Sequence, residues 1–341
     1  MNIFIYILRR LLQIIPIYFL IITLVFVGVR LFPGDPFLFQ IKRITDYQLQ
    51  LYLERVRLHG LDQPIWEQYK IYLKNLFTGN WGDSWYLANG APVWPLIKFS
   101  IKNSLEFLLL TLTGSYFIGT RLGKWAAGKK NRYLTGSMRW GIVFMSAIPI
   151  LLVAMISQYY MGQSLIFYKY TRGIKSALMG DPTYVTGMRL IDCILDLRFD
   201  LAWDTLLHYL VPGITFTLPI IALVSNHTRS SMLDVLQTDY IRTAQAKGCP
   251  PNYLLKKHAF RNSIIPVVSI MGMSFPLFIS NLILVEYLYS LPGFGALFYL
   301  AFKFLDYNVL IAITCMSVTI SVAGNFIADV LYAIVDPRIR Y

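Results

Sequence analysis

The sequence predicts an all-α integral membrane protein with six transmembrane helices and cytoplasmic N- and C-termini. Composition is the first indication: 56% of the 341 residues are hydrophobic, only 14% are charged, and mean hydropathy is +0.53. Soluble domains carry about 25% charged residues. Long uncharged stretches and an uneven distribution of Lys and Arg around them are the second and third indications. This hydrophobicity excludes a disordered chain, and three cysteines in 341 residues exclude a small disulfide scaffold.

Six stretches are apolar enough to be membrane spans, each of which needs about 20 mostly apolar residues. They cover residues 11–29, 103–120, 140–165, 205–226, 264–285 and 307–328. The first follows Arg9 and Arg10, as the apolar part of a signal peptide would. Its 19 residues exceed the usual length of about 7–15, and no small-x-small cleavage site follows. We therefore expect it to remain as a membrane anchor.

The loops between the spans indicate the orientation, because cytoplasmic loops are enriched in Lys and Arg. With the N-terminus inside, the cytoplasmic segments are 1–10, 121–139, 227–263 and 329–341. With Asp329 assigned to the end of the sixth span, they hold 16 of the 31 basic residues against three acidic ones, whereas the rest of the chain has 15 of each. The formal net charge of +13 is therefore a signal of membrane topology, and we expect no nucleic-acid partner. The basic segments are expected to face anionic lipid headgroups and a cytoplasmic partner.

Two large loops, 30–102 and 166–204, are expected on the outer side. The first is predicted to contain helices at 45–59 and 64–77, a loop rich in Gly and Trp at 79–90, and an amphipathic interfacial helix at 91–102. The second mixes Tyr, Arg and Asp. Loops of this length are usually functional. A lid that only packs on the bundle is the alternative interpretation.

The cytoplasmic loop 227–263 has the most distinctive pattern. Residues 233–247 have helical character, and Gly248 is placed where a left-handed residue would end the helix. Pro250 and Pro251 stop that helix and can begin the next, which is basic and leads into the fifth span. A short, exposed helix with small residues would suit contact with another protein, although an ordinary connecting loop fits these features equally.

The sequence contains no pattern of a catalytic, cofactor-binding or metal site. It lacks the G-x-x-x-x-G-K-[ST] phosphate loop and the H-E-x-x-H motif. Its histidines and cysteines are scattered over different segments and form no ligand pair: His59, His208, His227, His258, Cys193, Cys249 and Cys315. Only Glu106 and Asp329 are ionisable residues within spans, and both lie near span ends, so a proton relay across the bilayer is not expected.

Small and weakly polar residues do form stripes at helical spacing on two spans. One consists of Ser269, Met273, Pro276 and Ser280, and the other of Thr314, Ser317, Ser321 and Gly324. Such stripes permit close packing between helices, which is the simpler interpretation. The alternative is a polar-lined passage, with Ser269, Met273, Pro276, Ser280, Thr314, Ser317 and Ser321 as candidate pore-lining residues.

Several motifs, in order and over nearly the whole chain, resemble the permease subunits of ABC importers. The resemblance is to the oligopeptide/dipeptide/nickel group and to the first of its two permease types. The motifs are Arg9-Arg10-Leu11-Leu12-Gln13, Arg30-Leu31-Phe32-Pro33-Gly34-Asp35-Pro36, Gly60-Leu61-Asp62-Gln63-Pro64, Tyr240 to Gly248, His258-Ala259-Phe260-Arg261-Asn262, Val285-Glu286, Leu291-Pro292-Gly293-Phe294-Gly295, Asp306-Tyr307 and Asp336 to Tyr341.

This resemblance implies a type I ABC importer permease fold in a prokaryotic cell membrane. Its segment Tyr240 to Gly248 resembles the EAA loop, whose coupling helix docks in a groove of an ATP-hydrolysing subunit. The positions carried over as the docking core are Thr243, Ala244, Ala246, Lys247 and Gly248. Thr243 stands where the acidic residue of the wider class would be.

The implied partners are a second, similar permease subunit in a heterodimer, two ATP-binding subunits, an extracytoplasmic solute-binding protein and membrane lipid. ATP and Mg²⁺ would be bound by the partners, and no cofactor by this chain. The implied substrates are peptides or related small solutes, including nickel chelates and oligosaccharides. The alternatives are a self-sufficient secondary carrier or channel, an intramembrane enzyme, and a membrane scaffold. A carrier would show inverted repeats or midplane charges, and neither is evident.

Overall fold

The computed structural model shows an elongated helical protein and describes residues 3–31, 46–88, 90–128, 132–164, 168–250 and 253–335. Within these ranges the only extended pairing is an isolated bridge between Asp83 and Pro92. The helices are α1 (Ile3–Leu31), α2 (Asp46–Leu58), α3 (Ile65–Phe77), α4 (Val93–Gly128), α5 (Arg132–Ala147), α6 (Ile150–Gly162), η2 (Tyr168–Thr171), α7 (Arg189–Leu195), α8 (Phe199–Leu236), α9 (Asp239–Ala246), η3 (Leu254–Ala259), α11 (Phe260–Met273), α12 (Phe275–Leu288), α13 (Phe294–Lys303) and α14 (Tyr307–Val335).

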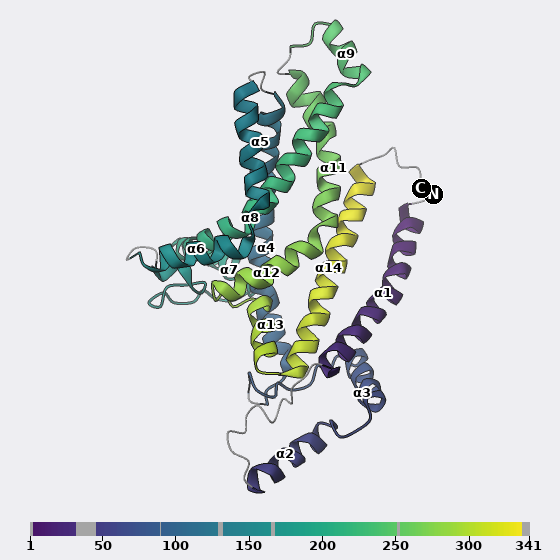
Figure 1. Cartoon of the computed structure of the whole chain (residues 1–341), viewed down its shortest axis with the longest axis vertical. Coiled ribbons are helices and arrows are strands. Elements are labelled where there is room, and N and C mark those ends of the chain that lie inside the picture. Colours follow the sequence, from purple (N-terminus) through teal and green to yellow (C-terminus); the bar gives the residue numbers. More distant parts are fainter. Residues whose placement is uncertain are drawn as a thin grey trace.

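Helices α4 and α8 form the most extensive pair and run parallel (Figure 1). Their contact depends on glycine. A Cβ at Gly119 would lie 2.7 Å from Val224 Cβ, and one at Gly123 would lie 2.6 Å from the carbonyl oxygen of Ser225. Farther toward the other end, Phe107 packs against Phe216 with ring centroids 5.9 Å apart. Small residues thus let the two backbones approach closely, as in membrane helix pairs generally.

Two predicted spans are each divided into two helices with a bend between them. The stretch 140–165 is divided at Pro149 into α5 and α6, whose axes differ by 89°. The stretch 264–285 is divided at Ser274 into α11 and α12, which differ by 56°, with Pro276 in the first turn of α12. Proline removes a backbone hydrogen bond and clashes with the preceding turn, so each break lies beside a proline. In Figure 1, α6 extends sideways from the bundle, to the left of α4.

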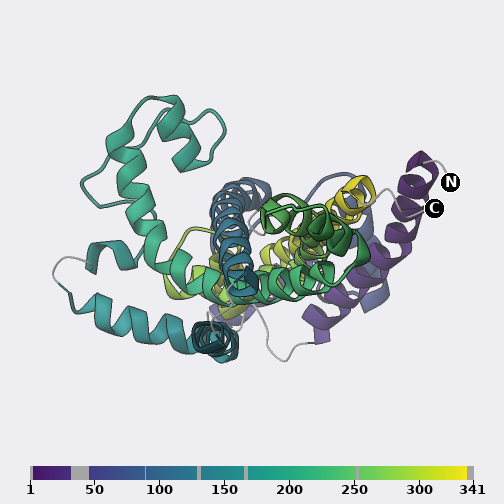
Figure 2. The same cartoon turned by 90° about the horizontal axis from the view of Figure 1, so that it is seen from above.

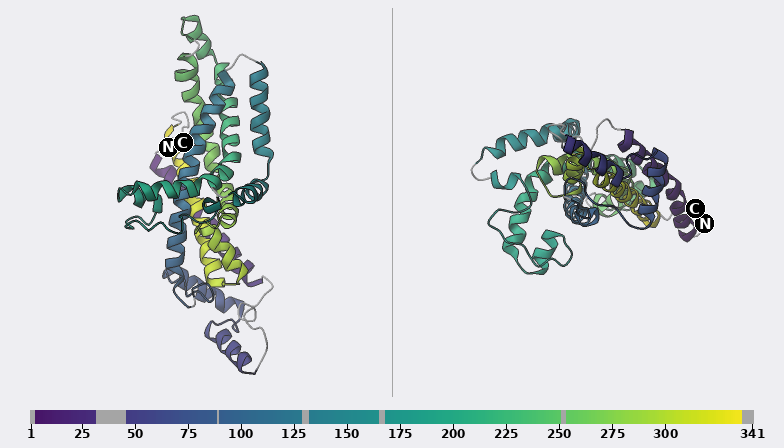
Figure 3. Two further views of the ribbon diagram at one scale, coloured as in Figure 1. Left: turned by 90° about the vertical axis from the view of Figure 1, so that its left-hand side faces the viewer. Right: turned by 90° about the horizontal axis from the view of Figure 1, so that it is seen from below.

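Three described helices are long and apolar enough to cross a membrane: Leu12–Leu31, Phe199–Leu236 and Tyr307–Ala328. The two bent pairs raise the number to five. The predicted stretch 103–120 lies within the 36-residue α4, whose polar residues leave it outside that group. Its role as the sixth span stays a prediction. Helix α14 runs antiparallel to α1, so the start of α1 and the end of α14 point toward the side that carries α9 (Figures 1 and 3).

The outer segments agree with the predicted helices in two places and differ in one. Helices α2 and α3 match the predicted ranges 45–59 and 64–77 within one or two residues. The predicted interfacial helix at 91–102 is instead the first part of α4. The motif at 33–36 and the ending 336–341 lie outside the described residues. Viewed along the long axis, residues 168–204 project sideways from the bundle (Figure 2).

Candidate functional site

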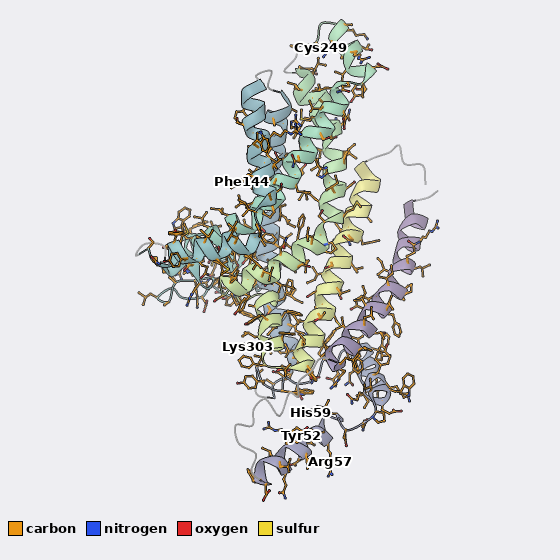
Figure 4. All side chains as sticks on the ribbon, viewed as in Figure 1. Tyr52, Arg57, His59, Phe144, Cys249 and Lys303 are labelled. Carbon is orange, nitrogen blue, oxygen red and sulfur yellow. The ribbon has the colours of Figure 1, made fainter. Side chains whose placement is uncertain are left out.

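The helix α9 and the turn that follows it form a hairpin at one extreme of the molecule. Figure 1 places α9 at the end of the long axis opposite to α2, and Figure 4 shows Cys249 at the same tip. Thr238 precedes α9 in an extended conformation, and its hydroxyl donates a hydrogen bond to the carbonyl of Val235 at the end of α8. The predicted single helix over 233–247 is therefore two helices, α8 and α9, separated at Gln237 and Thr238.

Gly248 ends α9 in the conformation that the sequence predicts. Its φ is +82°, in the left-handed region that glycine tolerates without strain. The N–H of Gly248 bonds to the carbonyl of Gln245, and the N–H of Cys249 bonds to the carbonyl of Ala244. This pair of bonds is a Schellman motif, which caps the last carbonyls of a helix. The chain direction at the tip is thus fixed by local hydrogen bonds.

The candidate docking residues occupy the outward side of this hairpin. Ile241 is the buried residue of α9 and marks the side that faces η3 and α8. Thr243 and Ala246 lie on the opposite side at helical spacing, and both are exposed, as is Lys247. Ala244 lies on the flank and is half-buried. The hairpin therefore presents a short face of small side chains and one cation.

A side-chain bond joins α9 to the helix that follows the hairpin. Asn262 Nδ2 donates to the Tyr240 hydroxyl oxygen at 2.9 Å, linking α9 to α11. The predicted second helix over 252–262 is observed as the π-helix η3 followed by α11. Sequence reasoning did not identify Tyr240, Ile241 and Asn262 as the residues that hold the hairpin. Ile241 could have been predicted to be buried, because it is an apolar residue within an otherwise polar segment.

The candidate pore-lining residues lie on two stretches, one around the bend between α11 and α12 and one on α14. Met273, Pro276 and Ser280 are exposed around the bend between α11 and α12, and Ser269 is half-buried nearby. On α14, all three candidates are half-buried: Thr314, Ser317 and Ser321. The packing interpretation has direct support at Gly324, where a Cβ would lie 2.3 Å from the ring of Phe275.

A mainly apolar pocket with a few polar side chains, which sequence reasoning missed, lies between α5, α8 and α12. It has a volume of about 240 Å³, and its polar lining comes from Ser146, Asn226, His227 and Asn281. Asn226 and His227 were visible as polar residues at the end of the fourth predicted span. Asn281 lies beside them only because of the bend before α12. No local sequence pattern predicts this neighbourhood.

The motif before the last helix is held together by a buried carboxylate. Glu286 on α12 accepts hydrogen bonds from Ser104 Oγ at 2.6 Å and from the N–H of Gly295 at 2.7 Å. Ser104 in turn accepts from the N–H of Phe294. Gly295 is in the first turn of α13, so Glu286 satisfies amide groups at a helix N-terminus, where negative charge is favourable. This acid fixes α13 to α4 and α12.

Glu106, expected near a span end, makes a second connection of the same kind. Its carboxylate accepts from the Tyr209 hydroxyl at 2.9 Å and from the N–H of Ile191 at 3.0 Å. Ile191 is in the first turn of α7. One turn of α4, from Asn103 to Glu106, thus binds both the second outer loop and the loop before α13.

A third carboxylate joins the first outer loop to α14. Asp306 accepts from Ser84 Oγ at 2.6 Å and from the N–H groups of Tyr86 and Leu87 at 3.0 and 3.2 Å. Within the described residues, no group of three or more His, Cys, Asp or Glu side chains is arranged to hold a metal ion. These acids therefore act as structural anchors for outer segments.

Comparison with known proteins agrees with this architecture over the full chain. Residues 119–341 match the family described as binding-protein-dependent transport system inner membrane component, and residues 3–113 match the N-terminal domain of such components. The oligopeptide transport system permease protein AppB of Bacillus subtilis is 36% identical over 337 residues, covering 98% of this chain and 99% of that protein.

Two further relatives give the same result. The dipeptide transport system permease protein DppB of Alkalihalophilus pseudofirmus is 32% identical over 338 residues, covering 98% of this chain and 99% of its own. The glutathione transport system permease protein GsiC of Escherichia coli K12 is 31% identical over 343 residues, with the same coverage. This chain therefore belongs to the inner-membrane components of binding-protein-dependent transport systems, and it is a permease subunit of an ABC importer.

Proposed function

We propose that this subunit forms half of the translocation pathway of an importer for peptides. Three relatives that align over 98% of the chain are named for oligopeptide, dipeptide and glutathione transport, and all three substrates are peptides. A second, different permease subunit would form the other half. Met273, Pro276 and Ser280 are then candidates to face the pathway, because they are exposed at the bend between α11 and α12.

The hairpin of α9 is the proposed coupling element, and it carries the functional assignment. It protrudes at one end of the molecule, and the Schellman turn and the Tyr240–Asn262 bond fix its shape. Two ATP-binding subunits would dock on that side, one against Thr243, Ala246 and Lys247. Closure of the ATPases on ATP would then pull on α9 and, through α8, shift the pathway between its two access states. The bias comes from tighter contact in one state than in the other.

The remaining assignments follow from this arrangement. The side that carries α9 is cytoplasmic, so both chain termini are cytoplasmic and an extracytoplasmic solute-binding protein delivers substrate to the opposite end. We expect six membrane segments, with α4 as the second, in the prokaryotic cell membrane. The subunit itself catalyses no reaction and binds no cofactor, and ATP with Mg²⁺ is held by its partners.

A natural thiol allows a direct test of the coupling assignment. Cys249 is partly exposed at the hairpin tip, whereas Cys193 and Cys315 are buried. A maleimide carrying a photoreactive group at Cys249 should capture the ATP-binding subunit in the purified complex. The yield of this cross-linked product should change when a non-hydrolysable ATP analogue is added. Capture of lipid alone would contradict the proposal.

Two variants serve as matched controls. Cys249→Ser should abolish the cross-link, which shows that the buried cysteines do not react. Adding Lys303→Cys to that variant moves the thiol to the half of the molecule away from Cys249, where Figure 4 places Lys303. A cross-link from Lys303→Cys to the ATP-binding subunit would contradict the proposed orientation.

A further inference from the structure

The corner formed by α7 and the start of α8 has its polar and apolar residues inverted relative to a water-soluble fold. Its inner side contains Arg189, Asp192, Asp204, Thr205 and His208, each at most 4% exposed. Its outer side contains Ile191, Ile194, Leu195, Phe199 and Trp203, which are 38–64% exposed. Residues that face water on a soluble helix are mostly polar. The inversion therefore indicates that this surface does not face water.

The buried polar residues have hydrogen-bond partners, and Nε2 of His208 is the one buried side-chain atom among them without one, so the inversion is a built feature. Arg189 donates to Thr205 Oγ1 at 3.1 Å and also pairs with Asp181. Asp192 accepts from the N–H groups of Thr186 and Gly187, both at 2.8 Å. Because buried polar groups are costly without partners, these bonds hold the inner side inward and leave the apolar side outward.

The apolar surface continues without interruption along α8. Phe199, Trp203, Leu207, Leu210 and Ile214 follow at steps of four, four, three and four residues, which places them on one side of the helix. All five are exposed or half-buried, whereas the neighbouring Leu201, Ala202 and Tyr209 are buried. This stripe belongs to a helix that is long and apolar enough to span a membrane. The exposed apolar side chains of α8 and those of the corner should therefore be surrounded by the same medium.

The exposed charged residues of this corner are Asp196, Arg198 and Asp200, which lie in or next to the turn between α7 and α8. Arg198 pairs with Asp200 at 2.9 Å, and both side chains are about half exposed. Leu197, between the two helices, is 73% exposed and has a φ of 55°, which a non-glycine residue rarely adopts. Tryptophan beside charged groups at the end of a spanning helix is typical of the interface between hydrocarbon and headgroups.

We propose that the α7–α8 corner is a lipid anchor embedded in the membrane leaflet opposite to α9. Ile194, Leu195 and Trp203 would contact acyl chains, and Arg198 and Asp200 would reach the headgroups. Burying apolar surface at about 25 cal/mol per Å² stabilises such an anchor. The continuous stripe on α8 favours lipid over a partner protein, since a protein interface would have to extend along the whole helix. The proposal requires membrane insertion of α8 and is independent of the coupling role of α9.

Spin-label accessibility tests this proposal in the importer complex reconstituted in lipid nanodiscs. Nitroxides are attached at Ile194→Cys and, separately, Trp203→Cys, each in a Cys249→Ser background. We expect collision with oxygen, which dissolves in lipid, to exceed collision with a water-soluble nickel chelate. Leu24→Cys on the exposed side of α1 gives the lipid reference, and Tyr47→Cys on α2 gives the water reference.

Each other outcome overturns the proposal. Accessibility to the nickel chelate like that of Tyr47→Cys would place the corner in water. An immobile label that neither reagent reaches would place it against another subunit. If the labelled variants fail to fold, quenching by brominated lipid acyl chains is compared between the natural chain and Trp203→Phe. Equal fractional quenching of the two would also overturn the anchor.

Discussion

The crossing of α4 and α8 can be tested with one methyl group. In Gly123→Ala, the new Cβ would lie 2.6 Å from the Ser225 carbonyl oxygen, 2.6 Å from Thr228 Cβ and 3.1 Å from the Arg229 nitrogen. Two of these three atoms belong to the backbone, so rotation of a side chain cannot make room. The helices must separate by about 0.8 Å before the shortest contacts reach the ordinary 3.4 Å. Overpacking of this kind costs about 1–3 kcal/mol.

Gly114→Ala is the matched control for this substitution. Gly114 lies in the same helix, and a Cβ there has no atom within 4 Å. Both substitutions gain the same helix propensity of about 1 kcal/mol, so their difference isolates the packing cost. Thermal unfolding in one detergent should give a midpoint for Gly123→Ala that is roughly 2–8 °C below that of Gly114→Ala. Equal midpoints would show that the two helices do not approach as closely as described.

Three further outcomes are expected. Ser104→Ala and Glu286→Ala should be non-additive in unfolding free energy by about 1 kcal/mol or more, because each removes the hydrogen bond between the two side chains; full additivity would refute the contact. The hydrogen bond from Lys175 lowers the pKa of Asp181, so its stabilisation is present above the unfolded pKa of about 3.9 and is lost as pH falls through the folded value. Pepsin cleavage of residues 168–188 should therefore rise more between pH 4.5 and 2.5 than in Asp181→Asn, and equal rises would contradict this. Gly248→Pro removes the N–H that bonds to Gln245 and forbids φ of +82°, so ATP-driven uptake should fall at least about tenfold while the subunits still co-purify; unchanged uptake would refute the coupling assignment.

The features that the sequence predicted well are those set by local chemistry. The end of α9 at Gly248 depends on one glycine and two hydrogen bonds within five residues. Helices α2 and α3 lie in predicted ranges because capping and periodicity are local signals. The break beside Pro149 could also have been predicted from the proline. It was missed because the spans were identified by the absence of charged residues, and that criterion does not detect a proline that bends a span by 89°.

The features that the sequence did not predict depend on contacts across the chain. Ser104 and Glu286 are separated by 182 residues, and Ser84 and Asp306 by 222. In each pair, one residue has the sequence context of an ordinary loop or span residue, so its hydrogen-bond partner cannot be predicted from neighbouring positions. The inverted corner of α7 and α8 is similar, because Arg189 and Asp192 suggest a solvated helix until their burial is known.

These contacts indicate how the two ends of the subunit are connected. Helix α8 has 38 residues and therefore extends about 57 Å along its path, from the α7–α8 corner to the hairpin of α9. Near its outer end, Tyr209 bonds to Glu106 of α4, and farther along, Gly119 and Gly123 seat α4 directly against it. A displacement of α9 therefore reaches α4 through backbone contact and not through flexible side chains. Because Ser104 and Glu106 lie within one turn of α4, the same displacement reaches both α13 and α7. In the proposed coupling, the loops at the end opposite to α9 therefore respond to the hairpin without any relay of charges between the two ends.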